Sequence, residues 1–244
     1  MFELVLLGLG VGFLSGLFGI GGGTILVPLL IFLGYETKIA IGISVVQMVF
    51  SSLYGSYLNN KKGTLDIVMV TTIGAGGFAG ALLSGTITSY FSDATLQAIF
   101  LAFATFALVR LFMTTHVHEE TKEVHKGLLF IVGFVIGIIS MTIGVGGSLI
   151  LVPILVGFLR VPLRKATSAG LFFVVFSSIS GLISHSMHGH IDYTSGTIIG
   201  LASLFGVYLG IHMKHKIDAK IQKKLLMLFY LTVVVYLTYK IFGA

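Results

Sequence analysis

The chain has 244 residues, of which 56% are hydrophobic and only 10% are charged. Soluble domains carry about 25% charged residues, so a chain with a mean hydropathy of +1.05 has too little polar surface to coat a water-soluble globule. The absence of cysteine excludes disulfides and thiolate metal sites. The net charge of +6 indicates cytoplasmic loops beside anionic lipid, and not a partner nucleic acid.

Eight apolar stretches follow one another along the chain, and the segments between them carry nearly all of the charge. They cover residues 2–33, 39–58, 65–88, 95–113, 127–159, 166–187, 192–211 and 221–242. A membrane-spanning helix needs about 20 apolar residues, so this pattern predicts an all-α polytopic membrane protein. The N-terminus has no basic segment, and we therefore expect the first helix to be retained.

The first and fifth stretches are too long for a single span. Residues 2–33 would reach about 48 Å as one helix, against a hydrocarbon core of about 30 Å. Each stretch contains a glycine cluster, with sequence GIGGG at residues 19–23 and GVGGS at residues 144–148. Because glycine costs roughly 1 kcal/mol inside a helix, both clusters predict a helix break. We expect the following helices to begin near Thr24 and Ser148.

The two clusters belong to an internal repeat. Seven positions of the first half recur 125 residues later, namely Gly12, Ser15, Gly19, Gly21, Gly22, Val27 and Pro28, matched by Gly137, Ser140, Gly144, Gly146, Gly147, Val152 and Pro153. Further matches, such as residues 50–52 with 176–178, extend nearly end to end. We therefore expect homologous repeats at residues 1–113 and 127–244, joined by a cytoplasmic connector at residues 114–126.

The charge of the loops separates two topologies for these repeats. If each broken stretch crosses the membrane, the halves are parallel and the Lys and Arg residues divide 9 to 6 between the two faces. If each broken stretch is re-entrant, each half has three further spans, the halves are inverted, and the division is 13 to 2. The positive-inside rule favours inverted repeats, with both termini outside.

Anion binding is the chemistry that the breaks favour. An anion in a low dielectric needs donors or positive charge, yet the spans contain almost no cation. A helix N-terminus supplies free backbone N–H groups and a partial positive charge, and inverted repeats with broken helices place their sites near the midplane. The predicted binding residues are Gly21, Gly22, Gly23, Thr24, Gly146, Gly147, Ser148 and Gln47. The residues predicted to line the path are Ser44, Ser51, Ser168 and Ser177.

Several of these residues have a plainer alternative. Gln47 can simply bond a neighbouring helix, and serines inside helices often donate to the preceding turn. Asp66 and Asp192, which are repeat partners at helix starts, are expected to act as caps. Glycines can serve close helix packing, and this is the expected role of Gly8, Gly12, Gly16, Gly76, Gly80, Gly206 and Gly210.

The alternative function comes from His185, His188 and His190, which are predicted to share one external loop. Histidines at this spacing can bind metal or titrate near neutral pH, whereas a solvated loop is the simpler interpretation. A cation or metal permease would lack membrane carboxylates and thiolates here. An intramembrane hydrolase is disfavoured, because no histidine falls in the middle of a span and no nucleophile elbow is present. We expect no cofactor.

The chain also resembles a known family. Residues 16–23, with sequence GLFGIGGG, and the following Val27-Pro28 resemble the signature of the sulfite exporter TauE/SafE family, and the second copy at residues 144–153 is similar. The resemblance covers the whole chain. It implies an inner-membrane permease, not an enzyme, that moves sulfite, thiosulfate, sulfoacetate or another sulfonate through the bilayer. A related group of thiosulfate importers uses membrane cysteines that this chain lacks.

Overall fold

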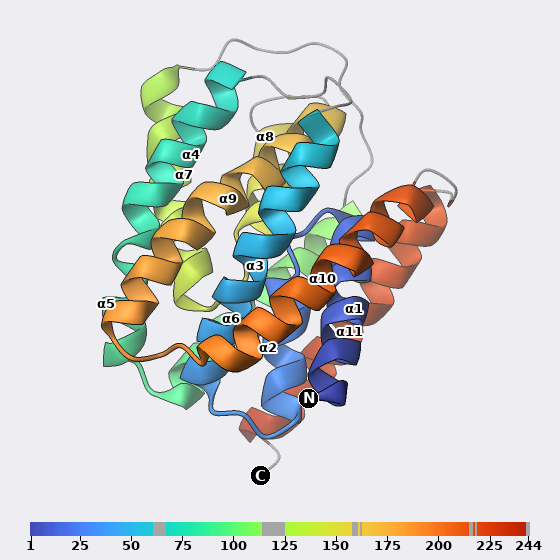
Figure 1. The fold of residues 1–244 in the computed structure, drawn as a ribbon. Coiled ribbons are helices and arrows are strands. Elements are labelled where there is room, and N and C mark those ends of the chain that lie inside the picture. Colours follow the sequence, from blue (N-terminus) through green and yellow to red (C-terminus); the bar gives the residue numbers. More distant parts are fainter. Residues whose placement is uncertain are drawn as a thin grey trace.

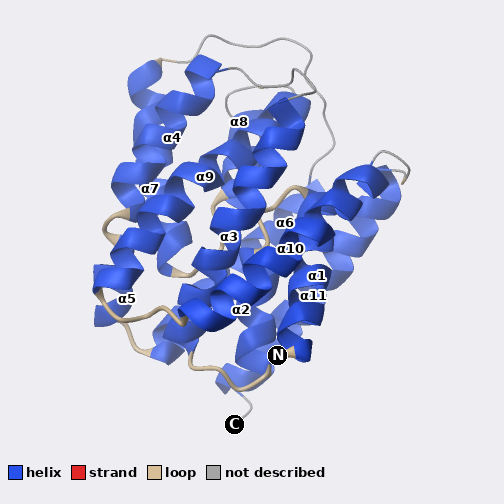
Figure 2. Ribbon diagram, in the orientation of Figure 1, coloured by secondary structure: helices blue, strands red, loops and turns tan. Residues whose placement is uncertain are grey.

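The computed structural model describes residues 1–60, 67–113, 125–157, 161, 163–214, 217 and 219–242. These residues form helices and no strand, as the composition predicts (Figures 1 and 2). The helices are α1 (Phe2–Phe18), α2 (Gly23–Phe32), α3 (Thr37–Asn60), α4 (Ile67–Ala81), α5 (Ser84–Tyr90), α6 (Asp93–Met113), α7 (Lys126–Thr142), α8 (Ser148–Gly157), α9 (Leu163–Met187), α10 (Tyr193–Lys214) and α11 (Ala219–Phe242). Most of the predicted connector lies outside the described residues.

Both predicted helix breaks are confirmed. The first separates α1 from α2, and the second separates α7 from α8. Left-handed backbone, which favours glycine, occurs at the same three repeat positions in both: φ is 70°, 78° and 62° at Gly19, Gly21 and Gly22, and 70°, 85° and 75° at Gly144, Gly146 and Gly147. The chain therefore needs glycine at these positions to leave one helix and start the next.

The stretch predicted as one span at residues 65–88 has the length of a span, Val68–Tyr90, but is interrupted at Leu82 and Leu83, where α4 ends and α5 follows. A contact with α9 accompanies the interruption. The backbone N–H of Gly85 donates to Ser184 Oγ at 2.9 Å, which replaces a bond along its own helix. The corresponding helix of the second half, α10, is continuous.

Close glycine contacts hold α1 against α10 and α4 against α7. A Cβ added to Gly12 would overlap the carbonyl oxygen of Ser203, and one added to Gly80 would overlap that of Phe134. Similar contacts at the other glycines of the two interfaces confirm the predicted packing role. In each interface the first helix of one half, α1 or α7, packs against the fourth helix of the other half, α10 or α4.

The centre of the bundle is formed by α3 and α9, which contact each other and run in opposite directions (Figure 1). The start of α3 lies beside the end of α9, since a Cβ on Gly42 would overlap the carbonyl oxygen of His190. In Figure 1 the start of α1 and the end of α11 share the lower end of the bundle, whereas α4, α7, α9 and α11 all start at the upper end.

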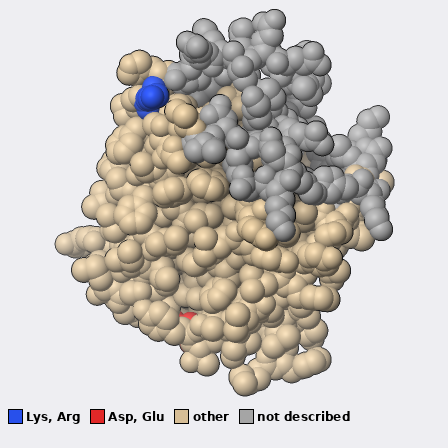
Figure 3. Space-filling view, turned by 45° about the horizontal axis from the view of Figure 1, so that its top comes forward, with Lys and Arg blue, Asp and Glu red and all other residues tan. Residues whose placement is uncertain are grey.

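The exterior is apolar, as a lipid-facing surface must be. Helical segments long and apolar enough to span a membrane include Thr37–Leu58, Val68–Tyr90 (α4 with α5), Ser168–Met187 and Tyr193–Met213. Large hydrophobic side chains such as Phe205 (61% exposed) point outward. On the face shown in Figure 3 the described surface is mostly uncharged, with one basic group near its upper edge and a small acidic patch near its lower end.

The α1–α10 contact predicts different outcomes for two glycines of one helix. Gly12→Ala forces the helices apart and should cost about 1–3 kcal/mol, lowering the melting temperature in detergent by several degrees. Gly10→Ala is the control, because a Cβ there meets nothing within 4 Å. Equal melting temperatures for the two variants would contradict the role given to this contact.

Candidate functional site

The two helix breaks meet inside the bundle. A Cβ on Gly23 would overlap the carbonyl oxygen of Gly144 and would lie 2.7 Å from Met48 Sδ. A Cβ on Gly146 would also lie 2.7 Å from the same sulfur atom. Met48, on α3, therefore lies between the first break and the second.

The carbonyl groups of the second break are bonded by side chains of the first half. Thr24 Oγ1 donates to the Val145 carbonyl oxygen at 3.3 Å, and Ser44 Oγ donates to that of Gly144 at 2.8 Å. Both side chains are fully buried. Two residues predicted for the site thus lie at the break, where they use their hydroxyl protons to satisfy acceptors of the protein.

Most of the backbone N–H groups at the two helix starts, unlike these carbonyl groups, have no hydrogen-bond partner in the described part of the chain. The first bonds of α2 and α8 are made by Ile25 and Leu26 to Gly22, and by Ile150 and Leu151 to Gly147. The N–H groups of Gly22, Thr24, Gly147 and Ser148 have no acceptor within the described part of the chain. One predicted donor is in use, because the Gly23 N–H bonds the Gly21 carbonyl at 2.5 Å.

Gln47 provides the most unusual side chain of the site. It is fully buried on α3, and neither Oε1 nor Nε2 has a hydrogen-bond partner among the described residues. A Cβ on Gly22 would overlap its Oε1 and would lie 2.7 Å from its Nε2, so the amide covers the start of α2. Leaving such a group unbonded costs about 1–3 kcal/mol. Within the described residues it makes no bond to a neighbouring helix, the plainer role that the sequence left open.

The second break is lined differently. The repeat partner of Gln47 is Phe173, whose Cε1 would lie 2.6 Å from a Cβ on Gly147. Ser140 Oγ lies 2.8 Å from the same point. The hydroxyls of Ser140 and Ser148 are buried and have no partner in the described structure. Sequence reasoning left Ser140 out of the site, although its repeat pairing with Ser15 beside the glycines was the available signal.

The serines predicted to line a path divide into two groups. Ser44 lies at the break, whereas Ser51 and Ser177 donate along their own helices, to Met48 at 3.4 Å and to Phe173 at 3.1 Å. These two follow the plainer interpretation of helix serines. Ser168 is buried, with 6% of its surface exposed.

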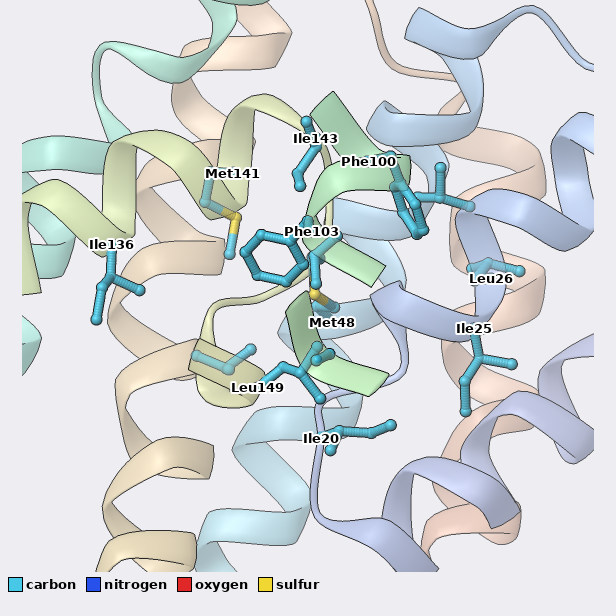
Figure 4. Packing of buried hydrophobic residues seen from close by; sticks show 14 of the residues in the cluster. Ile20, Ile25, Leu26, Met48, Phe100, Phe103, Ile136, Met141, Ile143 and Leu149 are labelled. Carbon is cyan, nitrogen blue, oxygen red and sulfur yellow. The ribbon is translucent and has the colours of Figure 1, made fainter. Parts of the chain in front are cut away.

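Apolar side chains fill the space between the breaks. Figure 4 shows Met48 near the middle of the buried cluster, between Phe103 and Leu149 in this view. Val174 also lies against both breaks, 3.3 Å from a Cβ on Gly21 and 3.4 Å from one on Gly146. A ligand can reach both helix starts only if Met48 and Val174 move aside. Methionine suits this, because its unbranched side chain adapts easily.

The histidines are not all in a loop. His185 lies in the last turn of α9 and is fully buried, whereas His188 is exposed beyond the helix end. Among the described residues no three His, Asp or Glu side chains form a metal-binding group. Asp192 caps α10, accepting from the Ser195 N–H at 3.0 Å. Hydrogen bonds from Ser195 lower the pKa of Asp192. Asp66 lies outside the described residues.

A buried pair of broken helices inside an apolar helical exterior defines a multi-pass membrane transport protein, and comparisons with known proteins agree. The family model for the sulfite exporter TauE/SafE matches residues 4–237. The chain belongs to this family, which is a membrane transporter family and not an enzyme family. No solved structure matches the chain significantly.

Its relatives carry transporter names. The probable membrane transporter protein YunE of Bacillus subtilis is 24% identical, over 89% of this chain and 89% of that protein. A probable membrane transporter protein of Methanocaldococcus jannaschii is 26% identical, over 89% of this chain and 87% of its own length. One from Haemophilus influenzae is 26% identical, over 78% and 76% of the two chains.

The unbonded amide predicts an unusual effect on stability. Gln47→Met removes two buried polar atoms and should raise the free energy of unfolding by about 1–3 kcal/mol, while it impairs transport. The control is Gln97→Met, since Gln97 Nε2 donates to Thr37 Oγ1 at 2.8 Å and its loss should destabilise. Thermal unfolding in lipid nanodiscs measures both. A lower melting temperature for Gln47→Met would show that the amide is already satisfied.

Proposed function

We propose that this protein is a permease for a small anion, which binds between the starts of α2 and α8. The observation that carries the proposal is the buried amide of Gln47, unbonded and facing the N-terminus of α2. Further unbonded donors lie at the two breaks, namely four backbone N–H groups and the hydroxyls of Ser140 and Ser148.

The state of the acceptors favours an anion over a cation. A bound cation needs carbonyl or carboxylate oxygens, but the carbonyls of Gly144 and Val145 already accept from Ser44 and Thr24. No Asp or Glu is among the buried residues of the described chain. A ligand that accepts hydrogen bonds fits this site, and two helix starts add partial positive charge.

The proposal includes an inverted arrangement of the two halves, with re-entrant breaks. Three observations support it. The helices α3 and α9 are antiparallel (Figure 1). The first helix of each half, α1 or α7, packs on a helix of the other half, α10 or α4. The Lys and Arg residues of the loops divide 13 to 2 between the two faces. In such an arrangement both helix starts point at one central ligand. The protein would lie in the cell (inner) membrane, with both termini on the outer side.

The substrate we propose is a sulfur oxyanion, such as sulfite, thiosulfate, sulfoacetate or another sulfonate. Its support is the family to which the chain belongs. Several oxygens around one sulfur atom can accept from donors on two sides at once, which matches donors on α2 and on α8.

Flux into proteoliposomes tests the proposed function. Sulfite, thiosulfate, sulfonates, sulfate and chloride are compared as internal or external anions, with empty vesicles as the background. We expect one or more sulfur anions to be carried above that background. Transport of a divalent metal, with no anion carried, would overturn the proposal in favour of a cation permease.

Alanine substitutions of the break glycines test whether transport is lost because the binding site is filled or because the backbone is strained. Gly22→Ala displaces the Gln47 amide and Gly147→Ala displaces Phe173, so anion transport should fall about tenfold or more, equivalent to at least about 1.4 kcal/mol. Gly34→Ala is the control, because Gly34 has φ of 90° but open space around it. It carries the same backbone strain away from the breaks. If all three variants lose transport equally, strain and not the site is responsible.

A further inference from the structure

Three histidines gather where α9 ends, in contact with α5 and α7. Figure 1 shows the end of α9 beside α5. Burial increases along the series: His188 is exposed, His190 is 8% exposed and His185 is fully buried. The cluster lies apart from the proposed anion ligands but reaches the end of α7, just before the second break.

Four contacts form one continuous chain through this cluster. His185 Nε2 lies 3.1 Å from the Met141 carbonyl oxygen, and His185 Nδ1 lies 3.3 Å from His190 Nδ1. His190 Nε2 lies 3.3 Å from Ser89 Oγ on α5, and Ser89 Oγ lies 2.9 Å from the Gly85 carbonyl oxygen. The chain thus runs from the end of α7 to α5.

The carbonyl groups at both ends can only accept, which fixes the protons in between. His185 must donate from Nε2, so its Nδ1 accepts from His190 Nδ1. Two neutral rings and one hydroxyl carry three protons for four contacts. In that state Ser89 donates either to His190 or to Gly85, but not to both. One additional proton on His190 lets Nε2 donate to Ser89 and lets Ser89 donate to Gly85.

We propose that His185 and His190 together bind a single proton, and that this proton fastens α5 to α9 and to the end of α7. A second proton is excluded from the pair, because both Nδ1 atoms would then carry hydrogen and face each other. The Gly144 N–H also bonds the Met141 carbonyl, at 3.3 Å. Proton binding is thereby linked to the second helix break.

The charged groups around the pair decide when the proton binds. His188 and Lys38 face His190, and Lys38 Nζ donates to the Ser89 carbonyl oxygen at 3.1 Å. Burial first, and then the positive charges of Lys38 and His188, lower the pKa of His190. The nearby carboxylates of Asp93 and Asp192 accept from Thr37 and Ser195. The proton therefore binds at a lower pH than it would on an ordinary histidine.

The first half has no equivalent of this cluster in its sequence. With the repeat spacing of 126 residues, His185, His188 and His190 correspond to Asn59, Lys62 and Thr64. The broken α4–α5 element is likewise matched by the continuous α10. The histidines and the helix that they fasten thus belong to one end of the molecule only.

Histidine titration of the full-length protein tests the proton site without any transport assay. Nuclear magnetic resonance of ring-labelled histidines in nanodiscs follows His185 and His190, assigned with His185→Gln and His190→Gln. We expect one shared protonation with a midpoint below about 6.5. Ser89→Ala should lower it by about one pH unit, a tenfold loss of proton affinity. His212→Gln is the control, because His212 Nδ1 contacts the Tyr208 carbonyl oxygen on α10 and takes no part in the four contacts.

Two independent protonations, or a midpoint that Ser89→Ala leaves unchanged, would overturn the proton site. The link to transport rests on the proposed function and is tested by flux of thiosulfate and methanesulfonate between about pH 5 and 8. We expect His190→Gln to flatten the pH profile of the wild type. An unchanged profile in that variant would overturn the link alone. If the wild type carries no anion, the proposed function fails while the titration still decides the proton site.

Discussion

The whole arrangement depends on the need to satisfy backbone polar groups where a helix is interrupted inside an apolar protein. Each interruption exposes carbonyl groups of one helix and N–H groups of the next. Here the two sets are treated differently. Thr24 and Ser44 bond the carbonyls of the second break, whereas the N–H groups that start α2 and α8 keep no acceptor among the described residues. The proposed preference for a negative ligand rests on these unbonded donors.

Close packing around the breaks keeps this arrangement in register. The glycine contacts between α1 and α10, and between α4 and α7, bring backbones together without intervening side chains. Each break therefore follows a helix, α1 or α7, that packs against the other half. Movement of one half against the other would carry the breaks apart or together, while Met48, in contact with both, can adapt its shape.

Sequence patterns predicted the features that depend on local backbone demands. The left-handed glycines, the restarts at Gly23 and Ser148 and the glycine packing surfaces all have a signal in the residues themselves. The α4–α5 interruption has none, and it coincides with a bond between Gly85 and Ser184, which are 99 residues apart. The burial of His185 was missed for a similar reason, since its spacing to His188 and His190 suggested a loop. The unbonded state of Gln47 depends on how the two halves meet, which periodicity does not encode.

The difference between Gln47 and Phe173 has a consequence for the empty protein. In a carrier made of two identical inverted halves, the inward-facing and outward-facing forms would have equal free energy and equal population. An amide over one helix start and a phenyl ring over the other remove that equality. A difference of about 1–3 kcal/mol, the scale of one unsatisfied amide, favours one form roughly 5- to 150-fold. If the halves are inverted as proposed, the unloaded carrier would rest mainly on one side of the bilayer and would bind its substrate with different apparent affinity from the two sides, while the gradient of the substrate would still set the direction of net movement.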